Sequence, residues 1–123
     1  MTIVTEPRLL LGRIARILFL LTTLVVWVLS LLPAPDLPNT GISDKLEHVI
    51  AYLVLATLGS LAFRGRRNAF LLFVLLCVMG VAIELLQNFS PGRSPEVADA
   101  VADGIGAAAG VVTGAAFAFV LSL

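Results

Sequence analysis

The stretch from Ala69 to Phe89 reads AFLLFVLLCVMGVAIELLQNF and contains no charged side chain before Glu84. A helix needs about 20 mostly apolar residues to cross the hydrocarbon core of a bilayer. This stretch has that length, and its polar residues Glu84, Gln87 and Asn88 all fall in its last two turns. It therefore predicts a transmembrane helix that ends in a polar tip.

Three further stretches of the chain have the same apolar character. None of them alternates apolar and polar residues with the period of two that marks a half-buried strand. The expected fold class is therefore all-α, a membrane-embedded bundle of four transmembrane helices that forms one domain over residues 1–123. The predicted spans are residues 14–32, 46–63, 69–89 and 95–121. The uncharged part of the first span is longer than the apolar region of about 7–15 residues in a signal peptide, so we expect this helix to be retained.

The overall composition agrees with a membrane protein. Hydrophobic residues make up 59% of the chain and charged residues 13%, whereas a soluble domain has about 25% charged residues. Too few polar side chains remain to cover a surface that faces water. The formal net charge is zero, so no excess of positive charge indicates a nucleic-acid partner. The lipid bilayer is the expected partner.

The distribution of cationic residues predicts the orientation of the helices, because short loops rich in Lys and Arg stay on the cytoplasmic side. Six of the eight cations precede the first span or separate the second from the third: Arg8, Arg13, Arg16, Arg64, Arg66 and Arg67. The other side receives seven of the eight acids: Asp36, Asp44, Glu47, Glu84, Glu96, Asp99 and Asp103. We therefore expect a multi-pass protein of the cytoplasmic (inner) membrane with both the N- and the C-terminus in the cytoplasm.

Local signals indicate where two of the helices begin. Ser43 is suited to cap the second helix, with Asp44 in its first turn near the positive end of the helix dipole. Ser94 is suited to cap the fourth helix, with Pro95 at its first position. The prolines between residues 33 and 38 exclude a regular helix and predict a stiff loop.

The fourth span carries Gly106, Gly110 and Gly114 at intervals of four residues. Glycines at this spacing line one face of a helix and let another backbone approach closely. They are therefore expected to be helix-packing residues. The approaching backbone belongs either to another helix of the same bundle or to a second copy of the chain in a homodimer.

Polar and ionisable side chains gather at the outer ends of three predicted helices. Glu47 and His48 share one face of the second helix with Asp44, and Tyr52 lies a turn deeper. Ionisable groups within a bilayer are costly, so they tend to face one another or a wet cavity. We therefore expect a shared, outward-facing polar pocket. Its candidate ligand-binding residues are Lys45, His48, Tyr52, Glu84, Gln87, Arg93, Asp99 and Asp103.

A purely structural role for this cluster is an open alternative. Lys45 and Arg93 are cations on the acidic side of the protein, and acids are available to both. The possible partners are Glu84, Asp99 and Asp103. Such ion pairs would hold the helix ends together without forming a binding site.

A catalytic role is a second alternative. His48 would act as general acid or base, because imidazole changes its charge near neutral pH, and Glu84 or Asp99 would orient the ring. The ligands of a metal-dependent version would be His48, Glu47, Asp99 and Asp103. The sequence contains no His-Glu-x-x-His motif and no cysteine cluster, so neither a metal nor another cofactor is expected.

The same residues resemble the sequence pattern of the VanZ-like family. Asp44 and Lys45, followed by His48 and Tyr52, resemble the D-K-x-x-H-x-x-x-Y opening of that pattern. The segment from Glu84 to Arg93 is similar to its E-x-x-Q…R stretch. Both pieces fall at the ends of predicted helices and follow one another in the family's order.

The last part of the pattern lies in the fourth span. Asp99, Asp103, Gly106 and Gly110 resemble the family's D-x-x-x-N-x-x-G-x-x-x-G ending, with Asp103 where the family usually has Asn. An ionised carboxylate only accepts hydrogen bonds, so we expect Asp103 to be protonated or paired with a cation. The resemblance covers roughly residues 33–115.

This resemblance implies a small polytopic protein of the bacterial cell envelope, in a family whose namesake is associated with low-level resistance to the glycopeptide teicoplanin. The first functional hypothesis is binding of an anionic amphipathic partner, such as a lipid-linked cell-wall precursor or an acylated glycopeptide. Arg93 would grip its anionic group, Lys45 would add charge, and His48 and Gln87 would bond to its polar head.

Two other functions are carried as alternatives. One is an intramembrane enzyme that acts on an envelope lipid, with His48 as general acid or base. The other is a small multidrug exporter, although the first span lacks the acidic residue that those exporters carry. Binding is favoured over catalysis.

Overall fold

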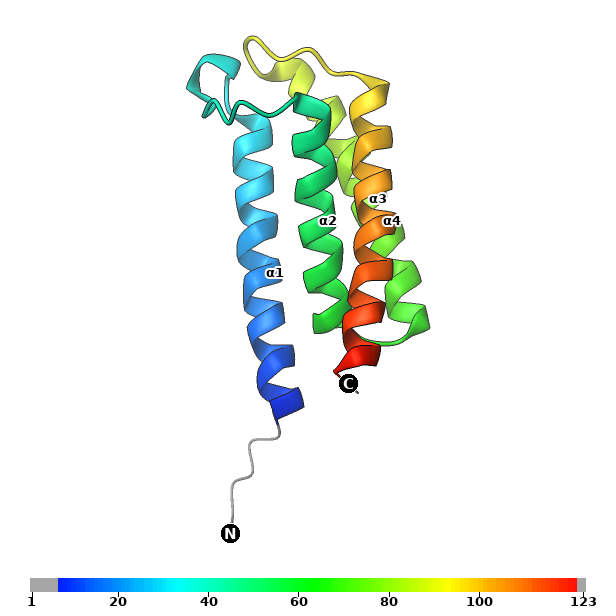
Figure 1. Ribbon diagram of the computed structural model, residues 1–123. Helices are drawn as coiled ribbons and strands as arrows, with labels where there is room; N and C mark the ends of the chain where they lie inside the picture. The colour runs from blue at the N-terminus through cyan, green and yellow to red at the C-terminus, as the bar shows by residue number, and fades with distance from the viewer. Residues whose placement is uncertain (1–6, 122–123) are drawn as a thin grey trace.

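The computed structural model describes residues 7–121 and is helical, without strands, over that range. Its elements are α1 (Pro7–Leu31), η1 (Ala34–Asp36), α2 (Asp44–Ala62), α3 (Arg66–Leu86), η2 (Gln87–Phe89) and α4 (Val97–Val120). Within the described residues, four helices are long and apolar enough to cross a membrane, the third being α3 continued by η2. Figure 1 shows them side by side in one bundle. The predicted all-α fold class with four spans is confirmed.

Several helix ends differ from the sequence prediction. α1 begins at Pro7 instead of residue 14, because proline suits the first position of a helix and the arginines that follow are good helix formers. α2 begins at Asp44, as the predicted cap Ser43 requires, two residues before the predicted span, and α3 begins at Arg66, three residues before its predicted span. The proline-rich segment is a loop, as predicted, but it contains one short 3₁₀ helix, η1. A 3₁₀ helix of three residues is a common connecting element.

The start of α4 is also corrected. The helix begins at Val97 instead of Pro95, and Ser94 does not cap it. Glu96 is the N-cap residue, with an extended backbone, and its N–H donates to Oε2 of Glu84 at 3.0 Å. This bond to α3 holds the chain outside the helical conformation at the position where the sequence predicted the first turn.

α2 and α4 form the most extensive helix pair of the bundle. Gly106, Gly110 and Gly114 of α4 lie against the backbone and small side chains of α2. A Cβ added at Gly110 would lie 2.5 Å from Cβ of Ala56, and one added at Gly114 would lie 2.5 Å from Cβ of Ser60. The glycine face is therefore covered by α2 within the same chain.

The buried core lies mainly between α2, α3 and α4. It contains Leu55, Ala56, Leu76, Ile83 and Ala107, each no more than 2% exposed. The outward faces of the helices are rich in exposed Leu, Val and Phe side chains, as expected for surfaces that contact lipid tails. The apolar interior and the apolar exterior together agree with a membrane-embedded bundle.

α1 is attached less closely, and it packs chiefly on α2. Among the described residues of α1, only Ala15 and Phe19 are buried. In the first half of the helix, Nε of Arg16 donates to the carbonyl oxygen of Ala62 at 3.3 Å, which satisfies an acceptor at the end of α2. The centre of the Phe63 ring lies 5.9 Å from the guanidinium carbon of this arginine and 6.0 Å from the centre of the Phe19 ring.

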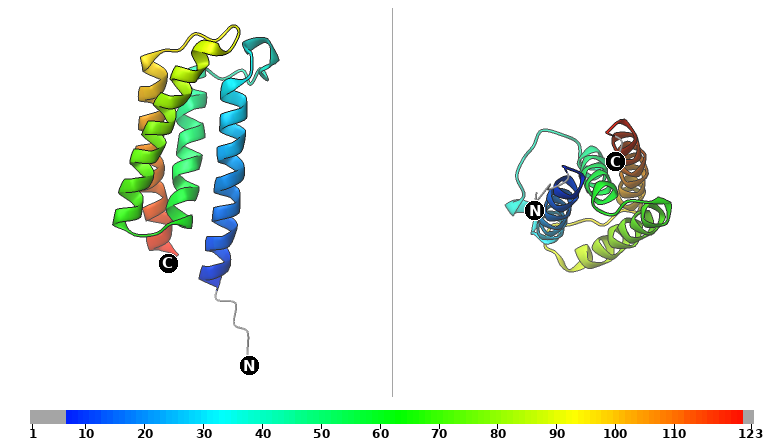
Figure 2. Two further views of the ribbon diagram at one scale, coloured as in Figure 1. Left: turned by 180° about the vertical axis from the view of Figure 1, so that it is seen from behind. Right: turned by 90° about the horizontal axis from the view of Figure 1, so that it is seen from below.

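The two ends of the bundle differ in charge. Both ends of the described chain lie beside the turn between α2 and α3 (Figures 1 and 2), where Arg8, Arg13, Arg16 and Arg64 line a cavity. The longer loops, residues 32–43 and 90–96, lie together at the opposite end. The cytoplasmic location of the arginine-rich end stays a prediction.

Candidate functional site

The polar residues singled out from the sequence come together at the loop end of the bundle, where α2 and α4 begin and α3 ends. Ser43 caps α2 as predicted, since its hydroxyl accepts the N–H of Leu46 at 3.3 Å. The helix that starts there places Asp44, His48 and Tyr52 one turn apart on the same face. The cluster forms between this face and the first two turns of α4.

The centre of the cluster is a hydrogen bond between His48 and Asp103. Nδ1 of His48 lies 2.6 Å from Oδ1 of Asp103, a residue that is only 1% exposed. Gly80 of α3 makes room for this carboxylate, because a Cβ there would lie 2.8 Å from Oδ2 of Asp103. The ring of His48 is fixed by this bond, with its other nitrogen, Nε2, 3.8 Å from Oδ1 of Asp44. The sequence analysis expected Asp103, which stands where the family usually has Asn, to be protonated or paired with a cation. Its partner in the structure is the imidazole of His48.

Lys45 connects the beginnings of α2 and α4. Its Nζ lies 2.7 Å from Oε2 of Glu96 and 2.8 Å from Oδ1 of Asp99. The side chain of Asp99 is 6% exposed, so this ammonium group compensates a nearly buried carboxylate. Lys45 therefore forms ion pairs that hold two helix ends together, which is the structural alternative to ligand binding that the sequence analysis left open.

Arg93 contacts α1 instead of the acidic cluster. Its Nε donates to the carbonyl oxygen of Leu32 at 3.1 Å, and its Nη2 donates to that of Leu29 at 2.6 Å. Over residues 7–121, no carboxylate lies within ion-pair distance of this guanidinium. A cation at the end of a helix also stabilises the negative end of the helix dipole.

Two residues that precede Arg93 in the chain also form hydrogen bonds to the end of α1. Nε2 of Gln87 donates to the carbonyl oxygen of Ser30 at 2.9 Å, and the hydroxyl of Ser90 donates to that of Leu31 at 2.9 Å. The last carbonyl groups of a helix have no partner within the helix itself. The segment from η2 to Arg93 therefore supplies the donors that the end of α1 lacks.

Glu84 lies behind His48, near the end of α3. It is 7% exposed, and its Oε2 accepts the N–H of Glu96. Its other oxygen, Oε1, is buried and finds no hydrogen-bond partner among the described residues, and the same holds for the hydroxyl of Tyr52. A carboxylate oxygen of Glu84 lies within 4.8 Å of a ring nitrogen of His48 and of a carboxylate oxygen of Asp103. The interior of the cluster thus contains a carboxylate oxygen and a hydroxyl group that have no hydrogen-bond partner among the described residues.

A cavity of about 370 Å³ opens beside this cluster, between α1, α2 and the loop that joins them. Its apolar wall includes Val26 and Leu29 of α1 and Ile50 and Ala51 of α2. Its polar lining is His48, Tyr52, Gln87, Arg93, Asp44, Glu47, Thr40 and Ser30. The cavity therefore joins an apolar surface of membrane-crossing helices to a polar surface at their ends.

The eight candidate residues from the sequence divide into two groups. His48, Tyr52, Gln87 and Arg93 line the cavity. The others lie outside its lining, in the hydrogen-bonded cluster around His48 or at its edge: Lys45, Glu84, Asp99 and Asp103. The two groups meet at His48.

Sequence reasoning missed some of the residues that form the site. Asp44 lines the cavity but was not among the candidate ligand-binding residues. Its spacing of four residues from His48, which puts both on one helix face, was the signal that could have identified it. The α1 wall, with Val26 and Leu29, carried no signal, because the apolar residues of one membrane helix look alike in sequence. Glu96 also lacked a signal, since its role depends on a contact between two helices.

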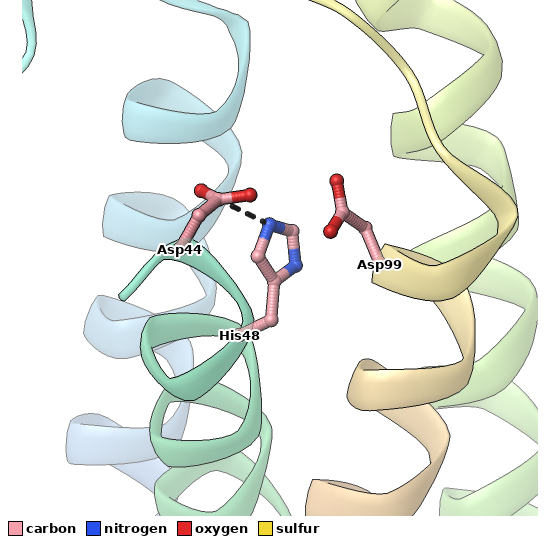
Figure 3. Close-up of side chains that lie close together, drawn as sticks. All are labelled: Asp44, His48 and Asp99. Carbon is pink, nitrogen blue, oxygen red and sulfur yellow. Dashed lines mark ion pairs between the residues drawn. The ribbon is translucent and has the colours of Figure 1, made fainter. Parts of the chain in front are cut away.

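The arrangement has defined chemical capabilities. His48 lines the cavity, and its Nε2 lies 3.8 Å from Oδ1 of Asp44, which lines the same cavity; this nitrogen is suited to accept a proton, accept a hydrogen bond or bind a metal ion. Two sets of possible metal ligands share this residue: Asp44, His48 and Asp99 (Figure 3), and His48, Glu84 and Asp103. Glu47, which the sequence-based metal hypothesis included, belongs to neither set.

A bundle of membrane-length helices, with arginines at one end and the acidic cluster at the other, defines a polytopic integral membrane protein. Within that class, the sequence matches the family model described as VanZ/LLP1 over residues 7–118. The chain therefore belongs to the VanZ/LLP1 family, and the resemblance noted from its motifs is confirmed. No curated protein and no solved structure matches the chain.

Proposed function

We propose that this VanZ-like protein of the bacterial cytoplasmic membrane binds an anionic amphipathic molecule at the end of the bundle that faces away from the cytoplasm. The ligand class is a lipid-linked cell-wall precursor or an acylated glycopeptide, and in the second case the protein contributes to glycopeptide (teicoplanin) resistance. The observation that supports this proposal is the cavity of about 370 Å³, which combines an apolar wall with a polar end. Pockets that bind small ligands commonly have this volume and this division of surfaces.

Arg93 is the residue best placed to receive the anionic group. A guanidinium has five N–H donors, and the bonds to the carbonyl groups of Leu32 and Leu29 use one each on Nε and Nη2, so three donors of this cavity-lining residue remain for a ligand. Because those bonds already fix the side chain, little rotamer entropy is lost when a ligand binds. Lys45 is bound to two carboxylates and does not line the cavity, so the proposal assigns it to the support of Asp99.

The orientation is part of the same proposal. The arginine-rich end of the bundle, with Arg8, Arg13, Arg16 and Arg64, is assigned to the cytoplasm under the positive-inside rule. The cavity then opens on the outer side, where lipid-linked precursors are used and where glycopeptides arrive. Labelling of a cysteine introduced at exposed Asn39 in intact cells tests this orientation, since a membrane-impermeant reagent reacts there only if the loop is outside.

The ligand proposal is tested by filling the cavity without touching the polar cluster. Ala51 lines the cavity, so Ala51→Leu reduces its volume, whereas Ala115→Leu makes the same change on the exposed face of α4. Each full-length protein is purified in particles that retain native membrane, and the enclosed lipids are measured by mass spectrometry. We expect wild type and Ala115→Leu to enrich the same anionic lipid, and Ala51→Leu to lose most of that enrichment. Identical lipid profiles in all three proteins would refute the proposal.

Acid–base catalysis by His48 is the second candidate function. The observation that favours it is the 2.6 Å hydrogen bond between Nδ1 of His48 and the buried Asp103, because such a bond orients an imidazole that lines the cavity and leaves its other nitrogen free for proton transfer. The orienting carboxylate is Asp103, where the sequence had suggested Glu84 or Asp99. Incubation of the purified protein with the enriched lipid, followed by mass spectrometry, distinguishes the two functions. Conversion that is lost in His48→Gln selects catalysis, and an unchanged lipid selects binding.

A further inference from the structure

We propose that Asp44, His48 and Asp99 form a binding site for a divalent transition-metal cation at the edge of the cavity. Each residue offers one donor atom, and these atoms all lie within 4.8 Å of one another (Figure 3). The distance from Nε2 of His48 to Oδ1 of Asp44 is 3.8 Å. Metal–ligand distances of about 2.0–2.2 Å require donors to lie roughly 3–4 Å apart, so small side-chain rotations bring the three atoms to one ion.

Two of the three ligands are held in place by residues outside the site. Nδ1 of His48 lies 2.6 Å from Oδ1 of Asp103, so an ionised Asp103 keeps the ring proton on Nδ1 and leaves Nε2 for the metal. Lys45 binds Oδ1 of Asp99 at 2.8 Å and leaves the second oxygen of that carboxylate available. Metal-binding histidines and carboxylates commonly have such supporting partners, which fix the orientation of the ligand atoms.

The charge around His48 also favours a bound cation. The carboxylates nearest to His48 are Asp44, Glu84, Asp99 and Asp103, while Lys45 is the one permanent cation that pairs with an acid within residues 7–121. The second, independent observation concerns Glu84, one of whose carboxylate oxygens lies within 4.8 Å of a ring nitrogen of His48, while its Oε1 is buried and has no partner among the described residues. A buried acceptor without a partner calls for an explanation, and a nearby positive ion is one that geometry allows.

The site is open on one side. Asp44 and His48 both line the cavity, and the side chain of Asp44 is 60% exposed. Three protein ligands leave at least one coordination position for water or for an oxygen atom of another molecule. If the proposed function holds, this position lets the metal bind the phosphate or carboxylate of the amphipathic ligand, which the surrounding acids alone would repel.

The donor set also indicates the kind of metal. Imidazole nitrogen suits Zn²⁺ and its neighbours in the first transition series, whereas Mg²⁺ and Ca²⁺ prefer oxygen ligands throughout. Two carboxylates and one neutral imidazole carry two negative charges, which match the charge of the ion. We therefore expect Zn²⁺ to bind more tightly than Mg²⁺ at this site.

Calorimetric titration of the full-length protein with Zn²⁺, after removal of metal with a chelator, tests the proposal. Wild type is expected to bind one ion per chain. Loss of a supporting residue typically lowers metal affinity about 10–100-fold, so Asp44→Asn, which removes a ligand, is expected to lower it at least about tenfold. Glu47→Gln is the matched control, because Glu47 lines the same cavity three residues away but belongs to neither donor set. The exposure of Asp44 makes its loss compatible with folding.

Four outcomes would overturn the site. The first is failure of one Zn²⁺ per chain to saturate wild type, and the second is binding of Mg²⁺ as tight as that of Zn²⁺. The third is equal Zn²⁺ affinity in Asp44→Asn and Glu47→Gln, which removes Asp44 from the ligands. A larger loss in Glu84→Gln than in Asp44→Asn would instead assign the ion to the inner set with Asp103. The titration contains no added lipid ligand, so a negative result rules out the metal site alone. The lipid-binding proposal is decided separately, by the lipid analysis of Ala51→Leu and Ala115→Leu.

Discussion

Replacement of Gly110 by alanine is expected to loosen the contact between α2 and α4 and to destabilise the bundle. The added Cβ would lie 2.5 Å from Cβ of Ala56, 2.5 Å from the carbonyl oxygen of Leu53 and 3.0 Å from the backbone nitrogen of Thr57. None of these atoms belongs to a flexible side chain that could turn away. Carbon atoms pack best at about 3.5–4.0 Å, so the two helices have to separate by about 1 Å.

The size of the effect follows from two opposing contributions. A gap of about 1 Å forfeits roughly a quarter to a half of the attraction of each contact along the interface, and overpacked cores lose about 1–3 kcal/mol. Alanine recovers up to about 1 kcal/mol, because it favours the helix more than glycine does. The expected net loss in the free energy of unfolding for Gly110→Ala is about 1–2 kcal/mol.

Gly104→Ala is the matched control, with the same substitution on the same helix. A Cβ at Gly104 would meet only Sγ of Cys77 at 3.8 Å, an ordinary contact distance, so this variant is expected to be as stable as wild type or slightly more stable. Unfolding of the purified proteins in mixed micelles, followed by the helical circular dichroism signal, compares the three. Equal unfolding midpoints for Gly110→Ala and Gly104→Ala would refute the close-packing argument.

Two further expectations concern the polar end of the bundle. Arg93→Ala removes two charge-assisted hydrogen bonds to α1, so amide hydrogen exchange in the last turn of α1 should become at least about tenfold faster, while Arg66→Ala at the opposite end leaves it unchanged. His48 is the only histidine of the sequence, so ¹⁵N-histidine labelling gives a single imidazole spectrum. The low-field proton on Nδ1 should disappear in Asp103→Ala and persist in Asp44→Asn, and its persistence in Asp103→Ala would contradict the hydrogen bond.

Much of the fold could be predicted from the sequence, because the length of an apolar stretch decides whether a helix crosses a membrane. The helix ends were less predictable, since contacts between helices decide them. Ser43 caps α2 through a bond within its own turn, so its role was visible. Ser94 has the same local chemistry, but the bond from Glu96 to Glu84 moves the start of α4 beyond it.

The candidate site was predictable to the extent that it depends on spacing within one helix. Asp44, His48 and Tyr52 share a face because they are four residues apart. The partner of His48 was not predictable, because the rotation of α4 against α2 decides whether Asp99 or Asp103 meets the ring, and glycine packing fixes that rotation. The partners of Arg93 are backbone carbonyls, which every residue has, so no side-chain pattern indicates them.

The attachment of α1 to the segment between Gln87 and Arg93 has a consequence for biosynthesis. α1 is made first, yet the donors that satisfy its final carbonyl groups are 57 to 64 residues further along the chain. Until those residues leave the ribosome, water at the membrane surface has to hydrate these carbonyls. The last turn of α1 therefore gains these hydrogen bonds only after α3 has been made, and a nascent chain that stops before Gln87 lacks all of these donors.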